Sequence, residues 1–215
     1  AVIHTGDMTQ HGQAAEFLHA RTLLGELEAP LYVTPGNRDG RDGMSRAFAV
    51  DGYMRADCTF VHYAVDRHPV RLVTVDSLAD DGDNKGDFCE ARLAALDTTL
   101  NDKPERPTAL FMHHPPFDVP VAPDPFAYQC RRAAANLASV VSLHPQVVRM
   151  FTGHMHRPWT AKVGGVAAST VPSIATDLRK GDYPPPMDGQ PVYQVHRFED
   201  DWGFASETRL TASRS

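Results

Sequence analysis

Four short apolar stretches of this chain are each followed by residues that can bind a metal ion. The stretches cover residues 1–5, 31–34, 109–112 and 147–151, and they are followed by Gly6-Asp7, Gly36-Asn37-Arg38-Asp39, His113-His114-Pro115-Pro116 and Gly153-His154-Met155-His156. Each stretch has the length and apolar character of a buried strand. Because a rigid sheet can aim the residues that follow its strands at one point, open α/β sheets bind ligands there. The repeated arrangement predicts an α/β fold with a polar site at the strand ends.

The predicted elements form one domain over residues 1–215, with no internal repeat and no linker. Helices are predicted at 12–28, 42–49, 88–100 and 131–143, and strands at 1–6, 31–35, 59–65, 70–75, 108–112, 147–151, 158–163, 166–170, 191–198 and 202–210. Leu18, Leu23 and Leu27 belong to the apolar face expected for the first helix. Strand–helix units followed by late hairpins are typical of a mixed sheet, or of two such sheets face to face, with helices outside.

Composition excludes several classes of protein. The chain is 42% hydrophobic, which suffices for one large core. Its net charge of −6 argues against binding to a nucleic-acid polymer, so a phosphate ligand needs local positive charge such as bound metal ions. No apolar stretch reaches the roughly 20 residues that span a membrane. Three cysteines without CxxC spacing (Cys58, Cys89 and Cys130) argue against a disulfide framework, and we expect a cytoplasmic protein.

Two of the candidate ligands have ordinary alternatives when each is taken alone. Asp7 follows Gly6, whose backbone freedom allows a sharp turn at a strand end. The Asp7 carboxylate can bridge two cations there, or it can cap the helix that follows. Asn37 can supply a neutral oxygen ligand, or it can form an Asx turn after Pro35-Gly36.

The histidine pairs point to a metal more strongly. Two prolines follow His113 and His114, and they fix an extended chain that holds both imidazoles at a strand end. His154 and His156 are two residues apart on an extended segment, so both rings can be aimed into one site. Carboxylate, amide and imidazole ligands together suit manganese, iron, zinc or cobalt. The joint pattern predicts a metal centre formed by Asp7, Asn37, His113, His154 and His156.

In these motifs the chain resembles the calcineurin-like metallophosphoesterase superfamily. Four motifs of the chain are most similar to the class III cyclic-nucleotide phosphodiesterase and glycerophosphodiesterase branch of this superfamily. These motifs are Thr5-Gly6-Asp7, Val75-Asp76-Ser77, Met112-His-His-Pro-Pro-Phe117 and Thr152-Gly-His-Met-His156. The similarity covers residues 1 to about 198. It implies two facing mixed β-sheets flanked by helices, an αββα sandwich with a dinuclear metal site at the strand ends.

The resemblance also implies a role for each matching residue. Asp7 would bridge two ions of manganese, iron, zinc or cobalt, His156 would serve the first ion, and Asn37, His113 and His154 would complete the shell of the second. The implied reaction is hydrolysis of a small phosphodiester, of the cyclic-nucleotide or glycerophosphodiester type, by a metal-activated hydroxide. Asn37 and Arg38 would bind the substrate. His114 would reach the rim of the site as a third such residue, or pack beside Pro115. Related enzymes often form dimers, so a homodimer is expected.

Two features depart from the family pattern. The family has an Asp-x-His motif on a strand upstream of the Gly-Asp motif, and no such motif precedes Asp7 here. We therefore expect a chain that is truncated at its N-terminus and lacks the first strand. Arg38 stands where the family usually has histidine, and arginine cannot act as a general acid near neutral pH. It can still bind a phosphate oxygen and stabilise developing charge, with Asp39 orienting its guanidinium, so diesters with good leaving groups should be the better substrates.

Other readings remain open at this level. The chain could be a catalytically weak or inactive module that binds one metal or a phosphate and acts through a partner. It could also be a mononuclear hydrolase using Asp7, His113 and His154. The run Asp81-Gly-Asp83-Asn84-Lys85-Gly86 resembles half a calcium loop, but Lys85 occupies a ligand position, so a solvated acidic loop is the preferred interpretation.

Overall fold

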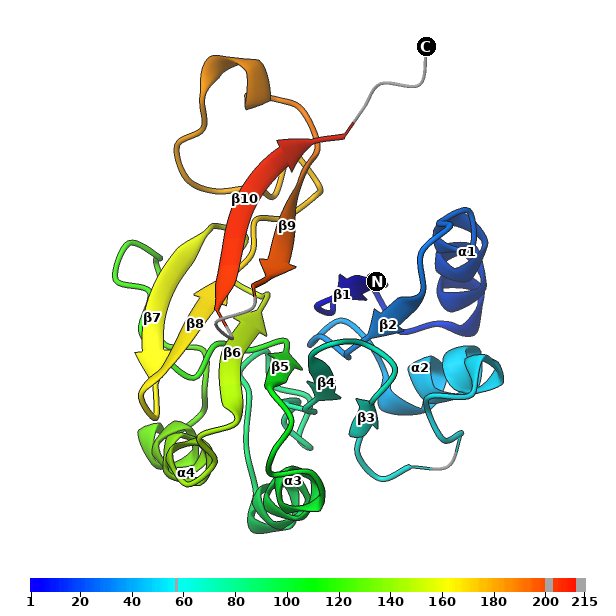
Figure 1. The fold of residues 1–215 in the computed structure, drawn as a ribbon. Coiled ribbons are helices and arrows are strands. Elements are labelled where there is room, and N and C mark those ends of the chain that lie inside the picture. The colour runs from blue at the N-terminus through cyan, green and yellow to red at the C-terminus, as the bar shows by residue number, and fades with distance from the viewer. Residues whose placement is uncertain (57, 200–202, 212–215) are drawn as a thin grey trace.

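The computed structural model describes residues 1–56, 58–199 and 203–211, which form a layered α/β fold (Figure 1). In chain order the elements are β1 (Val2–His4), α1 (Ala14–Leu24), β2 (Leu31–Val33), α2 (Arg41–Phe48), η1 (Ala49–Asp51), β3 (Tyr63–Val65), β4 (Arg71–Thr74), α3 (Glu90–Asp102), β5 (Thr108–Met112), α4 (Arg131–Ser142), β6 (Val147–Thr152), β7 (Trp159–Val163), β8 (Val166–Thr170), η2 (Pro185–Met187), β9 (Val192–Phe198) and β10 (Phe204–Leu210). The predicted order of helices and strands is confirmed. Residue 202, the predicted start of the last strand, lies outside the described residues. No helix among the described residues is long and apolar enough to cross a membrane.

The largest sheet has the strand order β3-β4-β5-β6-β8-β7. Strands β4, β5, β6 and β8 run parallel, whereas β3 and β7 pair antiparallel at its two edges. β5 is buried along its whole length, as expected for a central parallel strand covered on both faces. Met112 at the end of β5 pairs with Thr152 at the end of β6. His113 and the 153–156 segment therefore leave the sheet at the same edge.

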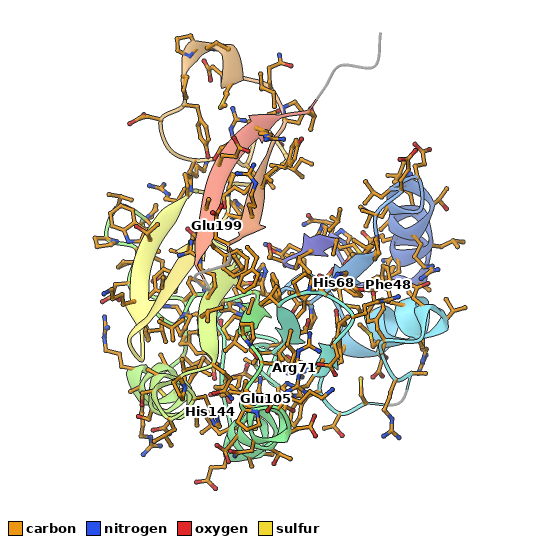
Figure 2. The ribbon with its side chains drawn as sticks, in the orientation of Figure 1. Phe48, His68, Arg71, Glu105, His144 and Glu199 are labelled. Carbon is orange, nitrogen blue, oxygen red and sulfur yellow. The ribbon has the colours of Figure 1, made fainter. Side chains whose placement is uncertain are left out.

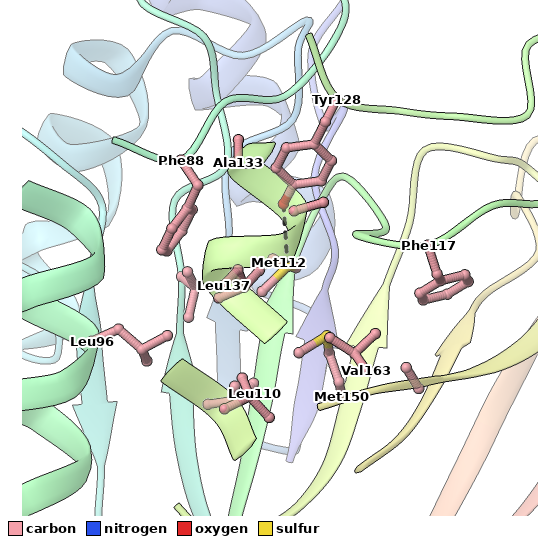
Figure 3. Packing of buried hydrophobic residues seen from close by; sticks show 14 of the residues in the cluster. Phe88, Leu96, Leu110, Met112, Phe117, Tyr128, Ala133, Leu137, Met150 and Val163 are labelled. Atoms are coloured by element: carbon pink, nitrogen blue, oxygen red, sulfur yellow. Dashed lines mark hydrogen bonds between the residues drawn. The ribbon is translucent and has the colours of Figure 1, made fainter. Parts of the chain in front are cut away.

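One face of this sheet packs against α3 and α4 (Figure 3). Leu110 and Met112 of β5 project into the layer, together with Met150 of β6, and meet Leu96 of α3 and Leu137 of α4. All five of these side chains are fully buried. Burial of this size is the main stabilising contribution of the layer, on the order of 2 kcal/mol for each such side chain.

The other face of the sheet is covered by two short ribbons. β1 and β2 form a parallel pair, and β9 and β10 form an antiparallel pair. The rings of Phe111 and Phe151 are stacked with centroids 5.4 Å apart, and Phe204 of β10 meets Phe151 edge-on. Two strand layers between outer helices confirm the predicted sandwich. Within the described residues the second layer consists of two separate sheets.

The first helix differs from its prediction. It covers only Ala14–Leu24, and Gly25 follows as its C-terminal cap. Phe17 is its buried residue, and it packs in one cluster with Val33 of β2 and Phe48 of α2. The predicted apolar face is wrong, because its leucines Leu18, Leu23 and Leu27 are 68%, 58% and 42% exposed. Periodicity could not choose the buried face, which is set by where α2 lies.

Polar contacts tie the helices to the sheet at the end opposite the metal-binding motifs (Figure 2). His144, just after α4, has its Nε2 atom 2.8 Å from Asp97 Oδ1 on α3. Arg71 opens β4, is buried, and contacts Asp66 and Asp102 through its guanidinium. These contacts anchor α3 and α4 where the parallel strands begin.

Acid should weaken the packing of β9 on the sheet through His196. Its ring lies 4.1 Å from the Phe151 ring, and burial lowers its pKa to about 4, with the charge of Arg149 adding to the effect. Because this pKa lies below the unfolded value, the unfolded chain binds more protons, so stability falls as pH drops from 6.5 towards 4. After allowance for partial exposure, about 1 kcal/mol should be lost at pH 5. Urea unfolding at pH 8 and pH 5 measures this loss, and His196→Gln should reduce it; equal losses in both proteins would contradict the assignment.

Candidate metal centre

Four of the predicted ligands converge beyond the ends of β1, β2, β5 and β6. Asn37 Oδ1 lies 3.0 Å from His113 Nε2 and 3.0 Å from His154 Nδ1. His113 Nε2 is 3.2 Å from His154 Nδ1 and 3.5 Å from Asp7 Oδ2. The fold brings these residues together although Asn37 and His154, for example, are 117 positions apart in the chain.

The hydrogen bonds around the cluster determine which atoms face its centre. His113 Nδ1 is 2.7 Å from the carbonyl oxygen of Thr5, which can only accept, so Nδ1 carries the proton and Nε2 presents its lone pair. The backbone N–H of Arg38 donates to Asp7 Oδ1 at 2.8 Å and leaves Oδ2 for the centre. The Asn37 NH₂ group donates outward, so its oxygen faces the histidines.

This arrangement of atoms fits a divalent cation. Asn37 Oδ1 and His113 Nε2 both present lone pairs at 3.0 Å, and Asp7 Oδ2 lies nearby. Acceptor atoms so close repel one another unless a positive charge lies among them. Ligand atoms at about 2.1 Å from one first-row ion lie about 3 Å from each other. The donor set and its spacing therefore suit an ion held by Asp7, Asn37, His113 and His154.

The backbone is strained at three predicted ligands. Asp7, His154 and His156 have φ angles of 57°, 64° and 57°, and they are the non-glycine residues with positive φ in the described part of the chain. Side-chain-bearing residues rarely adopt this conformation, which costs on the order of 1 kcal/mol each. Strain of this kind concentrates at functional sites, where surrounding contacts hold it in place. The sequence carried no sign of it.

His156 lies beside the cluster rather than inside it. Burial lowers its pKa, while the charge of Asp7 and a hydrogen bond with the Leu178 backbone oppose this shift. The backbone N–H of Lys180 donates to the His156 carbonyl oxygen at 2.8 Å. The segment between β8 and η2 thus holds His156 near Asp7, where the two residues could share a second ion.

The structure places His114 differently from the expected substrate contact. Its side chain is fully buried. Its Nδ1 lies 3.0 Å from the Ser77 hydroxyl, and its Nε2 lies 3.0 Å from the Asn84 carbonyl oxygen. One ring nitrogen from each of His113, His114 and His154 lies within 4.8 Å of the other two. Both nitrogens of His114 are already hydrogen-bonded, so we assign it to the wall of the site and not to a ligand or substrate contact.

Asp39 also differs from its predicted role. It accepts hydrogen bonds from the backbone N–H groups of Met8, Thr9 and Gly36 and from the Thr9 hydroxyl, at 2.8–3.2 Å. These bonds tie the loop after β1 to the loop after β2, in place of the expected orientation of the Arg38 guanidinium. The Arg38 side chain is exposed, and its backbone N–H donates to the Asp7 carboxylate and fixes its orientation.

Sequence reasoning missed two residues that support the centre. Thr5 acts through its carbonyl oxygen, so no property of its side chain could have revealed it. Asn84 accepts a hydrogen bond from the Asn37 amide at 3.2 Å. Its loop was noticed only as half a calcium motif, and its proximity to Asn37 depends on the fold.

The comparisons with known proteins agree with this geometry. Residues 1–158 match the family model described as calcineurin-like phosphoesterase. The chain is 29% identical over 212 residues to a probable glycerophosphodiester phosphodiesterase of Arcobacter nitrofigilis, a match that covers 96% of this chain and 76% of that protein. It is 33% identical over 175 residues to a glycerophosphodiester phosphodiesterase of Enterobacter lignolyticus, covering 80% of this chain and 62% of the relative.

A further relative and one solved structure extend the comparison. A 3′,5′-cyclic adenosine monophosphate phosphodiesterase of Escherichia coli K12 is 26% identical over 83% of this chain and 62% of its own length. The chain thus spans about three fifths of two of these relatives. A dimetal phosphatase of Danio rerio shares the fold with a TM-score of 0.58 and 16% identity, over 80% of this chain and 72% of that one. By its motifs, its strand-end cluster and the match over residues 1–158, the chain belongs to the calcineurin-like phosphoesterase family.

Proposed function

We propose that this chain is the catalytic part of a metal-dependent hydrolase of small phosphodiesters, of the cyclic-nucleotide or glycerophosphodiester type. The observation that carries the proposal is the convergence of four donor atoms on one point, from Asp7, Asn37, His113 and His154. The relatives named as phosphodiesterases support the reaction class.

In this proposal each residue has a task that follows from its contacts. Asp7, Asn37, His113 and His154 would hold a cation, which lowers the pKa of water and offsets the charge of a phosphodiester. The Thr5 carbonyl keeps the proton of His113 on Nδ1. Arg38 is exposed beside the cluster, so its guanidinium can bind a phosphate oxygen with two hydrogen bonds. Because an arginine side chain does not act as a general acid near neutral pH, Arg38 would orient the diester without protonating the leaving group.

Hydrolysis of bis(p-nitrophenyl) phosphate is the direct test, because its leaving group departs without a general acid. Turnover should require added manganese and should stop with a chelator. His113→Ala should remove it, whereas His19→Ala, on the exposed surface of α1, should behave as the unchanged protein. Faster hydrolysis of the monoester p-nitrophenyl phosphate, or metal-independent turnover, would show that the proposed reaction class is wrong.

The natural substrate class needs a separate experiment. Turnover of 3′,5′-cyclic AMP and of a glycerophosphodiester should be compared under identical conditions, with phosphate release measured after a coupled monoesterase. Turnover of either natural diester supports the proposed substrate class. If neither is hydrolysed, only hydrolysis of the artificial diester is supported. The homodimer and the cytoplasmic location remain predictions, and sedimentation analysis checks the first.

A metal-binding module with weak or no catalysis is the second candidate. One observation favours it, since the described residues supply four ligands for one ion but only Asp7 and His156 for another. Manganese bound per chain separates the candidates: two equivalents favour a dinuclear enzyme, and one favours the module or a mononuclear hydrolase. His156→Leu should cripple a dinuclear enzyme and leave a mononuclear one largely active.

A further inference from the structure

The segment of residues 80–87 contacts the metal centre from outside through Asn84. The Asn84 side-chain oxygen accepts a hydrogen bond from Asn37 Nδ2 at 3.2 Å. Its backbone carbonyl oxygen lies 3.0 Å from His114 Nε2. Asn84 therefore contacts one proposed ligand, Asn37, directly, and reaches His113 and His154 through the His114 ring.

The bond to His114 has a defined direction. The Ser77 hydroxyl oxygen accepts from the His114 backbone N–H at 3.1 Å, so its own proton is free to point to His114 Nδ1, 3.0 Å away. The other nitrogen, Nε2, then carries the ring proton and donates it to the Asn84 carbonyl. The ring of His114 faces the ring of His154 at 4.6 Å and that of His113 at 4.8 Å.

Contacts away from the centre hold the 80–87 segment in place. Lys85 Nζ lies 2.9 Å from the Asp124 carboxylate and donates to the Phe126 carbonyl at 3.0 Å. Gly86 forms bridges to Leu78 on one side and Tyr128 on the other. A Cβ atom on Gly86 would lie 2.9 Å from His114 Cβ, so the segment is packed closely against the histidine wall. The position of Asn84 is thus set independently of Asn37.

We propose that Asn84 is a positioning residue, whose side-chain oxygen fixes the Asn37 amide so that Oδ1 faces the cation. This inference rests on the metal centre of the proposed function. An amide has two nearly isosteric ends, and only its oxygen can bind a cation. Without the acceptor at Asn84, rotation of the Asn37 amide by half a turn would place its NH₂ group among the ligands. Residues that orient metal ligands typically change metal affinity by about 10- to 100-fold when they are replaced.

Three single substitutions test the proposal. Asn84→Leu keeps the shape and removes the acceptor, whereas Asn84→Asp keeps an acceptor oxygen. Asn101→Leu makes the same chemical change on the exposed surface of α3, where Asn101 donates to Asp97. None of them alters the backbone bond to His114. Circular-dichroism melting confirms that each variant is folded before binding is measured.

Two readouts decide the outcome without reference to activity. Manganese titration should give a dissociation constant at least 10-fold weaker in Asn84→Leu, and within about 3-fold of the unchanged protein in Asn84→Asp and Asn101→Leu. Nuclear magnetic resonance of the metal-free protein should show the hydrogen-bonded Asn37 side-chain NH₂ signal in the unchanged protein and in Asn84→Asp, but not in Asn84→Leu.

The opposite results overturn the proposal. Equal manganese affinity in Asn84→Leu and the unchanged protein would overturn it. An Asn84→Asp variant that binds manganese as weakly as Asn84→Leu would overturn it too, because either result shows that the acceptor oxygen of residue 84 does not control metal binding. Absence of manganese binding by the unchanged protein would overturn the metal centre and this inference together. Manganese binding without diester hydrolysis would reject the proposed function alone, and the variant affinities would still decide the role of Asn84.

Discussion

Replacing Asp7 by asparagine is expected to lower kcat/KM for a phosphodiester by about 10³-fold, with little change in the melting temperature. Asparagine keeps an oxygen for the Arg38 N–H and tolerates the positive φ of this position, so the loop should keep its shape. What disappears is the negative charge that faces His113 Nε2 across 3.5 Å and would attract and bridge cations.

Steady-state kinetics with bis(p-nitrophenyl) phosphate and saturating manganese measure the effect. The matched control is Asp118→Asn, which makes the same change at an exposed carboxylate paired with Arg131. The control should retain nearly full activity. An Asp7→Asn variant within 10-fold of the unchanged protein would remove Asp7 from the centre.

Replacing Gly36 by alanine should damage the site as strongly by steric means. A Cβ atom on Gly36 would lie 2.2 Å from the Asp7 backbone nitrogen and 2.3 Å from Asp7 Oδ1. Both atoms belong to a strained loop that cannot retreat freely. We expect about 2 kcal/mol of lost stability and at least 100-fold lower activity, because the Asp7 carboxylate must move away from the cluster.

Gly40→Ala provides the control in the same loop. Gly40 has a φ of −88°, and the nearest atom to an added Cβ is 3.9 Å away. Its replacement should cost less than about 1 kcal/mol and leave activity nearly unchanged. Urea unfolding and diester hydrolysis measured on both variants check the prediction. Equal behaviour of the two alanine variants would mean that the close approach of Gly36 to Asp7 has no functional importance.

Much of the fold could be read from local patterns. The strand at 108–112 was predicted with the bounds that the structure has, because a short apolar run there ends at the His113-His114-Pro115-Pro116 motif. The predicted strands at 59–65 and 70–75 pair antiparallel as β3 and β4, and those at 158–163 and 166–170 pair antiparallel as β7 and β8. The helix predicted over 12–28 was too long at both ends. In the structure it covers Ala14–Leu24, and Gly25 caps its C-terminus.

The site divides in the same way. The residue types and their places after strands were enough to predict that Asp7, Asn37, His113 and His154 meet, since parallel neighbouring strands end at one edge. The role predicted for Asp39 was wrong, and of the two roles left open for His114 the structure favours the buried one. Asp39 and His114 can each form several hydrogen bonds, and the sequence does not show with which groups. Their partners lie in loops about 30–40 positions away.

By itself the sequence determined the strands, the ligands that follow them and the order in which they occur. Only the tertiary structure decided which atom of each ligand faces the centre: the Thr5 carbonyl sets the protonated nitrogen of His113, and Asn84 sets the amide of Asn37. The reason is physical. Periodicity and composition report which residues are buried along one element, whereas the orientation of a side chain depends on hydrogen bonds to groups that folding brings within 3 Å from distant parts of the chain.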